Sequence, residues 1–308
     1  MDSTTPPFFK LLVRFARPWS LLAGVLTYIL GAGVAKYLGF GIHENRFWAG
    51  LLVVILMLMA SYALKAYYDR IDADSPLRRM QKDLEDEEQK AVQRLPRQSL
   101  LLIAFTLLTT GAAFTVLLFA DGAIHFASLI MLGITFLLAF FYGVPPFRFV
   151  YNGYGELSEG IIFSGLIPAL AYLLQTGDLH RLLPMLSFPL LAFYLAMRLA
   201  QSLEQYARDQ RLGRRTLIIQ IGWRRGMALH NILILSGYLL LVVAAAFGLP
   251  WALFWPAGVL TLPVGIFQIY QMNQISSGAK PDWRLLKLTA AATFGLTAYL
   301  LALTIWTG

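Results

Sequence analysis

The sequence predicts an all-α, polytopic membrane protein in which about nine transmembrane helices pack in one bundle. Hydrophobic residues make up 58% of the 308 residues and charged residues only 14%, a balance that does not suit the surface of a soluble domain. Uncharged runs of roughly 20 residues, the length that crosses a bilayer as a helix, recur along the whole chain. Each run is predicted to be a helix, because backbone groups in lipid need partners within their own segment.

The apolar runs begin after Arg17 and continue almost to the C-terminus. They cover residues 18–38, 47–67, 98–119, 124–142, 157–175, 182–205, 226–247, 251–271 and 286–306. Unbroken stretches such as LLVVILMLMASYAL exclude the alternating pattern of a membrane β-barrel. The first run is too long for the apolar part of a secretory signal, so it is expected to remain. The chain is predicted to form a single domain over residues 1–308.

The distribution of charge predicts the orientation in the membrane. A net charge of +8 alone would suit a nucleic-acid partner, but the basic residues gather in alternate connections, as the positive-inside rule describes. With a cytoplasmic N-terminus, all but four of the 25 Lys and Arg residues lie in inside segments. The exceptions are Lys36, Arg46, Arg181 and Arg198. The prediction is therefore a multi-pass protein of the cytoplasmic membrane, with its C-terminus outside, the bilayer as partner and no nucleic acid.

Four connections are expected on the cytoplasmic side, at about 68–97, 143–156, 206–225 and 272–285. The first and third are dense in charge, so function is expected there. The chain contains no cysteine, which excludes disulfides and a thiolate nucleophile.

The first charged group is SYALKAYYDRIDADSPLRR, residues 61–79. Lys65, Asp69 and Asp72 are spaced i, i+4 and i+7, so on a helix they share one face, whereas Asp74 falls off that stripe. Clustered carboxylates beside a membrane suit Mg²⁺, which prefers oxygen ligands and commonly bridges to substrate phosphates. The alternative is a solvated helix end whose charges pair with each other.

The second charged group is MRLAQSLEQYARDQRLGRRTLIIQIGW, residues 197–223. It predicts a polar stripe in steps of three, four and four, made of Arg198, Gln201, Gln205 and Asp209. An arginine within a membrane helix usually faces a bundle interior or an aqueous cavity and marks a functional pathway. An ion pair of Arg198 with Glu159 or Glu204 is the alternative.

Basic residues follow both acidic groups. Gly213 is expected to end the helix after Asp209, and Arg214 and Arg215 then stand where they would neutralise a diphosphate. Arg70 and Arg78 would add similar contacts from the first group. Ordinary positive-inside charge is the alternative.

The third segment is FYGVPPFRFVYNGYGELSEG, residues 141–160. Its two prolines predict an extended turn that presents polar and aromatic side chains at the interface. These side chains are Tyr142, Arg148, Tyr151, Tyr154 and Glu156. A belt of interfacial tyrosines is the alternative for the aromatic residues.

Together these segments resemble the UbiA superfamily of intramembrane aromatic prenyltransferases. The resemblance rests on RFARPWSLLAGVLTYILGAG, AYYDRIDAD, YGVPPFR with GYGEL, and RDQRLGRRTL. AYLLQTG and GEL most resemble the 1,4-dihydroxy-2-naphthoate polyprenyltransferases of menaquinone biosynthesis. The resemblance implies nine helices, two Asp-rich cytoplasmic motifs, Mg²⁺, a polyprenyl diphosphate and an aromatic acceptor.

The resemblance also implies roles for residues of this chain. Mg²⁺ would be held by Asp69, Asp72 or Asp74, and Asp209. Tyr68 and Tyr142 would face the allylic cation. The expected substrate-binding residues are Lys65, Arg70, Arg78, Arg148, Arg198, Gln201, Glu204, Gln205, Arg214 and Arg215.

The sequence departs from the family pattern in both motifs. Lys65 and Ala66 stand where the family commonly has Asn-Asp, and Gln201 and Gln205 stand where Asn and Asp are usual. Fewer carboxylates predict weaker Mg²⁺ binding, and Lys65 is expected to replace part of the charge of a metal. Two alternatives follow: a degenerate member that binds a prenyl lipid or uses another substrate, and a small-solute transporter with paired acidic half-sites.

Overall fold

The computed structural model describes residues 17–69, 96–211 and 213–308, and within these ranges all regular structure is helical. Eight of the helices it describes are long and apolar enough to cross a membrane. Helix α7, Phe126–Phe141, is apolar but shorter, at 16 residues. The predicted all-α membrane bundle is therefore confirmed, with α7 in the place of the fourth predicted run.

The helices follow the predicted runs closely. Up to Thr176 the chain contains α2 (Pro18–Tyr37), α3 (Glu44–Tyr68), α6 (Arg97–Ala120), α7, the 3₁₀ turn η1 (Phe149–Tyr151), α8 (Gly155–Ile161), η2 (Ile162–Leu166) and α9 (Ile167–Thr176). From Leu182 onward it contains α10 (Leu182–Leu203), α11 (Tyr206–Arg211), α12 (Leu217–Ile221), α13 (Trp223–Ala246), α14 (Trp251–Phe254), η3 (Trp255–Leu260), α15 (Leu262–Ser276) and α16 (Trp283–Thr307).

Two of the spans are interrupted by π-helical turns, η2 and η3. Each turn is associated with a proline: Pro168 follows η2 and Pro256 lies within η3. Proline has no backbone N–H and its ring crowds the preceding turn, so a wider turn accommodates it without breaking the span. The predicted runs 157–175 and 251–271 are therefore each built from three consecutive pieces.

The helices pack around a core of large buried side chains. Helix α2 contacts α9 and α16, α3 contacts α6, α7 and α9, and α10 contacts α13 and α16. Tyr28 of α2, Phe163 of η2 and Phe193 of α10 are almost fully buried in this core. Helix α6 packs mainly against α3, and only 11% of its most apolar stretch is buried, as expected for a helix that faces lipid.

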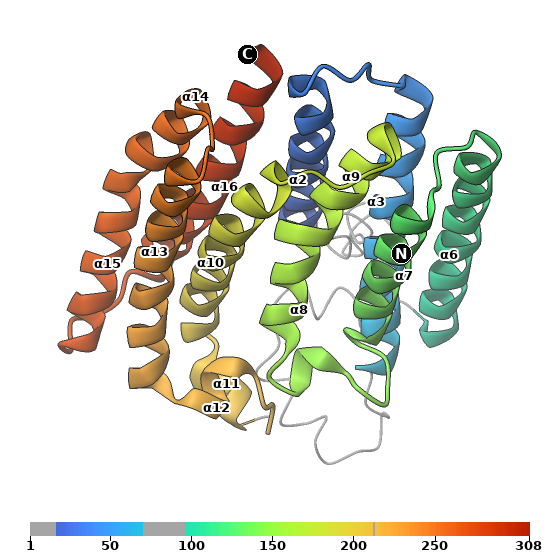
Figure 1. Cartoon of the computed structure of the whole chain (residues 1–308). Coiled ribbons are helices and arrows are strands. Elements are labelled where there is room, and N and C mark those ends of the chain that lie inside the picture. Colours follow the sequence, from blue (N-terminus) through green and yellow to red (C-terminus); the bar gives the residue numbers. More distant parts are fainter. Residues whose placement is uncertain (1–16, 70–95, 212) are drawn as a thin grey trace, which may run out of the picture.

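The short polar elements gather at one end of the bundle. Figure 1 shows α11 and α12 at its lower end, whereas the C-terminal end of α16 lies at its upper end. The C-terminal end of α3 also lies at the lower end. Asp69, which follows α3, is bonded to Arg148 just before η1. Tyr151 of η1 is in turn bonded to Arg215, between α11 and α12. The charged residues of three sequence segments are thus brought to the same end.

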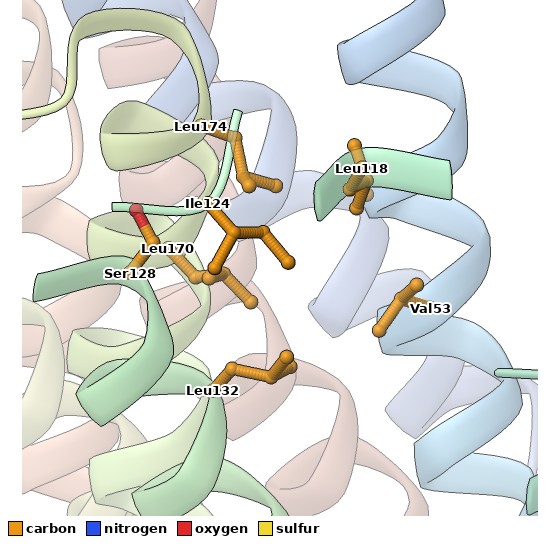
Figure 2. Close-up of a pocket in the computed structure, with 8 residues that line it drawn as sticks. Val53, Leu118, Ile124, Ser128, Leu132, Leu170 and Leu174 are labelled. Carbon is orange, nitrogen blue, oxygen red and sulfur yellow. The ribbon is translucent and has the colours of Figure 1, made fainter. Parts of the chain in front are cut away.

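A small apolar pocket lies elsewhere, between α3, α6, α7 and α9 (Figure 2). It is lined by Gly50, Val53, Leu118, Ile124, Ser128, Leu132, Leu170 and Leu174. Gly50 is near the start of α3, and Leu174 is near the end of α9, so this pocket lies towards the end opposite the charged segments. It offers a single hydroxyl, from Ser128, and does not overlap the charged site.

Candidate functional site

A carboxylate at the end of α3 lies among three donors. Asp69 directly follows α3, and its side chain is 20% exposed. Its Oδ2 accepts hydrogen bonds from Lys65 Nζ at 2.6 Å and from the Tyr151 hydroxyl at 2.5 Å. Its Oδ1 accepts from Arg148 Nη2 at 2.9 Å. Donors from α3 and from the segment around η1 therefore engage both oxygens.

Tyr151 connects this carboxylate to the second acidic group. The cationic centres of Lys65, Arg148 and Arg214 lie 5.3, 5.1 and 5.1 Å from the centre of its ring, within the range of cation–π attraction. Arg214 Nη1 also donates to Asp209 Oδ1 at 3.1 Å. The charged segments that follow α3, α7 and α10 thus meet at one tyrosine. The Tyr151 cluster is defined here as Lys65, Asp69, Arg148, Tyr151, Asp209 and Arg214.

The turn after α11 places Arg214 against Asp209. Gly213 has φ +64°, a conformation that suits glycine because it has no Cβ. The chain reverses there, and the Arg214 N–H donates to the Asp209 carbonyl at 3.0 Å, as in helix ends capped by a left-handed residue. The predicted helix end at Gly213 is confirmed.

Two close backbone approaches position the segment around η1. A Cβ placed on Gly143 would lie 2.5 Å from Lys65 Cβ and 2.6 Å from Lys65 Cα, so only glycine lets the end of α7 lie this close to α3. The Arg215 N–H donates to the Tyr151 carbonyl at 3.2 Å. The first contact fixes the segment on α3, and the second fixes it on the turn after α11.

The charges of the cluster stabilise one another. Burial alone would raise the pKa of the Asp69 carboxyl, but attraction to Lys65 and hydrogen bonds from Lys65 and Tyr151 hold that pKa below its usual value. Burial would lower the pKa of the Arg214 guanidinium, but Tyr151 and Asp209 raise it. Asp69 is therefore an anion and Arg214 a cation at neutral pH.

A second polar cluster lies within the bundle around Glu159, whose side chain is 4% exposed. Its Oε2 lies 2.8 Å from Arg198 Nε and accepts from the Tyr194 hydroxyl at 3.4 Å, and its Oε1 lies 3.7 Å from Arg17 Nη1. Arg198 also donates to Gln201 Oε1 at 3.3 Å. A charge buried in a membrane bundle needs such partners. The predicted alternative of an Arg198–Glu159 ion pair is therefore present.

The structure corrects the second predicted stripe. Helix α10 ends at Leu203, and Gln205 N–H donates to Ser202 O in a tight turn before α11 begins. A single continuous helical face through Arg198, Gln201, Gln205 and Asp209 is therefore wrong. Arg198 and Gln201 join the Glu159 cluster, and Asp209 joins the Tyr151 cluster.

The first predicted stripe is found only in part. Lys65 and Asp69 are paired as the spacing predicted, but α3 ends at Tyr68. Four further predicted residues lie outside the described ranges: Arg70, Asp72, Asp74 and Arg78.

The remaining predicted residues lie around the clusters. Glu204 forms an ion pair with Lys287, Gln205 is exposed, and the side chain of Arg215 is exposed. Tyr68 is 36% exposed and packs edge-on against Tyr67, whereas Tyr142 is buried.

Sequence reasoning did not give Tyr151 or Glu159 a place in the site. Tyr151 stood out only as one of several interfacial aromatic residues, and Glu159 only as an ion-pair partner. Their roles depend on contacts across 86 and 39 positions of the chain, with Lys65 and Arg198 respectively, which spacing within one helix does not indicate.

The described residues do not fit a Mg²⁺ ion by themselves. No group of three His, Cys, Asp or Glu residues that could hold a metal occurs in the described part of the chain. Basic side chains already engage both oxygens of Asp69 and one oxygen of Asp209. Mg²⁺ needs several free oxygen ligands in octahedral geometry, and these two carboxylates do not supply them.

Fold and site together define a multi-pass helical membrane protein with a cationic site at one end of its bundle. Residues 24–291 match the model of the UbiA prenyltransferase family, and the chain belongs to that family. No curated protein matches the chain.

Solved structures share the fold at low sequence identity. A UbiA homologue from Archaeoglobus fulgidus, bound to GPP and Mg²⁺, is 15% identical with a TM-score of 0.69, over 97% of this chain and 100% of that one. A digeranylgeranylglyceryl phosphate synthase is 12% identical with a TM-score of 0.66, over 97% and 99%. A UbiA homologue from Aeropyrum pernix K1 is 12% identical with a TM-score of 0.61, over 98% of each chain.

Proposed function

We propose that this protein transfers a polyprenyl group from a polyprenyl diphosphate to an aromatic acceptor within the cytoplasmic membrane. The observation that carries the proposal is the convergence of Lys65, Arg148 and Arg214 on Tyr151 at one end of an apolar bundle. Such a site suits a substrate with an anionic head and an apolar tail. Membership in a prenyltransferase family supports the same class of reaction.

The chemistry requires management of negative charge. The allylic carbon–oxygen bond breaks, and its electron pair leaves with the diphosphate. A ring carbon of the acceptor forms the new carbon–carbon bond, after which the ring loses a proton. Fixed cationic donors stabilise the leaving diphosphate as its charge grows, and they act more strongly where water is partly excluded. Lys65, Arg148 and Arg214 would supply these donors.

The acceptor is the finer part of the proposal. The segments AYLLQTG and GEL favour 1,4-dihydroxy-2-naphthoate, and hence a step in menaquinone biosynthesis. One relative of the same fold is a digeranylgeranylglyceryl phosphate synthase, so the fold alone does not fix an aromatic acceptor. Mg²⁺ accompanies GPP in the Archaeoglobus fulgidus homologue, and a divalent ion stays a prediction for this chain.

The test is prenyl transfer by the purified protein in lipid vesicles, from a radiolabelled polyprenyl diphosphate. The acceptors are 1,4-dihydroxy-2-naphthoate, 4-hydroxybenzoate and a glycerol phosphate. The test variant is Asp69→Asn with Asp209→Asn, which removes the carboxylates that hold Lys65, Arg148 and Arg214 in place. Its matched control is Asp121→Asn, which breaks an ion pair with Arg46 at the opposite end of the bundle.

Product with an aromatic acceptor, lost in the double variant and kept in the control, would support the proposal. Product with the glycerol phosphate alone would show that the acceptor is a glycerol phosphate and not an aromatic ring.

A second candidate is a family member that binds a prenyl lipid without turnover. It is favoured by one observation, the neutralisation of Asp69 and Asp209 by basic side chains. Saturable binding of the polyprenyl diphosphate with no product from any acceptor would favour this candidate. The transporter alternative gains no support from the family match.

A further inference from the structure

The Tyr151 cluster carries more positive than negative charge. Three of its members are cations, Lys65, Arg148 and Arg214, and only Asp69 and Asp209 are anions. All three cationic centres lie 5.1–5.3 Å from the Tyr151 ring centre. Like charges held this close repel one another, and an anion placed among them relieves that repulsion. The cluster as folded is therefore suited to an anion.

An ammonium group occupies the position that a metal would need at Asp69. Lys65 Nζ lies 2.6 Å from Asp69 Oδ2, and the Tyr151 hydroxyl donates to the same oxygen. A Mg²⁺ ligand oxygen would lie at about 2.0–2.1 Å from the ion, so Mg²⁺ and this ammonium compete for one place. Arg148 holds the other oxygen at 2.9 Å.

The cations also retain donors for a ligand. Arg148 Nε is buried and has no hydrogen-bond partner. Lys65 carries three N–H donors, of which contacts to Asp69 and Tyr151 account for two. A diphosphate offers several anionic oxygens, and charge-assisted hydrogen bonds to such oxygens are among the strongest in proteins.

From these contacts we infer that the Tyr151 cluster binds the diphosphate of a prenyl substrate through Lys65, Arg148 and Arg214 without a divalent metal. The inference rests on the proposed function, because it concerns the same substrate. It differs from the proposed function in assigning the charge neutralisation to side chains of the chain itself. Lys65 has the central place, because its ammonium donates to both the Asp69 carboxylate and the Tyr151 hydroxyl.

The test measures binding of geranyl diphosphate to the purified protein by calorimetry, once with EDTA and once with Mg²⁺. Geraniol, which has the same tail and no diphosphate, measures the part of the affinity that comes from the apolar tail. The variants are Lys65→Met, which removes the charge, and Lys65→Arg, which keeps it. Lys36→Met is the matched control. Lys36 donates to the Trp306 carbonyl near the C-terminal end of α16, at the end of the bundle opposite the Tyr151 cluster.

The expected result is binding in EDTA that Mg²⁺ changes little. Lys65→Met is expected to weaken it by about tenfold or more, because a charge-assisted bond is lost, whereas Lys65→Arg and Lys36→Met retain it. Geraniol is expected to bind the wild type more weakly than geranyl diphosphate does. Its affinity for both Lys65 variants is expected to equal its affinity for the wild type.

Each other outcome contradicts a separate step. Binding that requires Mg²⁺ would overturn the inference and leave the proposed function in place. Binding in EDTA that is insensitive to Lys65→Met would remove Lys65 from the site. No binding of geranyl diphosphate in either condition would overturn the proposed function, and the inference with it. The comparison of EDTA with Mg²⁺ uses the wild-type protein, so it holds even where a variant fails to fold.

Discussion

At the scale of single residues, Tyr151 organises the charged site. Its hydroxyl bonds to Asp69, and its ring lies beside the three cations. It therefore acts on the site in two separable ways, through a hydrogen bond and through its π-face. Substitutions that remove one and keep the other separate these contributions.

Tyr151→Phe keeps the ring and removes the hydroxyl. We expect it to lower the free energy of unfolding by about 1–2 kcal/mol, because the partly buried Asp69 loses a donor. Thermal unfolding in detergent measures the change. The control is Tyr154→Phe, since Tyr154 is 61% exposed and close in the chain. Equal midpoints for the two variants would show that the hydroxyl contributes no stability.

The lowered pKa of Asp69 predicts how stability depends on pH. A carboxyl whose pKa is lower in the folded than in the unfolded state stabilises the fold above the unfolded value, 3.8, and loses this contribution as pH falls through the folded value. The difference in unfolding midpoint between wild type and Asp69→Asn should therefore be constant from pH 7 to about 5 and shrink only in stronger acid. A difference that shrinks already between pH 7 and 6 would contradict this assignment.

At the scale of elements, the close packing of the end of α7 on α3 positions the segment around η1. Gly143 follows α7 and leaves no room for a side chain against Lys65 Cα and Cβ. Because those atoms belong to the helix itself, they do not yield as a flexible side chain would. The position of Arg148 and Tyr151 beside Asp69 depends on this contact.

Gly143→Ala is expected to destabilise the protein by about 1–3 kcal/mol and to weaken geranyl diphosphate binding, because it pushes α7 away from α3. Gly133→Ala is the control in α7, where a new Cβ meets nothing within 4 Å. It should leave binding unchanged. Unfolding midpoints and binding constants of both variants measure the two effects. If Gly143→Ala lowered stability but kept geranyl diphosphate binding, the contact of Gly143 with Lys65 would not be needed for the binding site.

The elements themselves were predictable from sequence, because each apolar run had to satisfy its own backbone. The pairing of Lys65 with Asp69 followed from helical spacing, and the turn at Gly213 from the need for a residue without Cβ. The break between α10 and α11 was missed because no proline or glycine marks Glu204 and Gln205. Tyr151 was missed because its partners come from three distant segments.

At the scale of the whole molecule, the polar end and the apolar pocket lie at opposite ends of the bundle. The Tyr151 cluster is built where α3 ends, and the pocket of Figure 2 lies near where α3 begins. Charge counting predicts that the polar end is cytoplasmic. Because the helices form one bundle, locating one residue at each of its two ends is enough to test the predicted orientation of them all.

The absence of cysteine from the sequence makes this orientation directly measurable. Asn45, at the start of α3, and Gln210, in α11, are both exposed and lie towards opposite ends of the bundle. In intact cells a membrane-impermeant maleimide should label Asn45→Cys. It should label Gln210→Cys only after permeabilisation. The reverse pattern would invert the predicted topology.

One bond in the site belongs to no side chain. The Arg215 N–H donates to the Tyr151 carbonyl, so the turn after α11 and the segment around η1 are joined through main-chain atoms. Any residue except proline can form this bond at position 215. The two halves of the site are thus joined by a bond that does not involve the side chains they carry. We expect this bond to persist when the charged side chains of the site are substituted, because none of its atoms belongs to them.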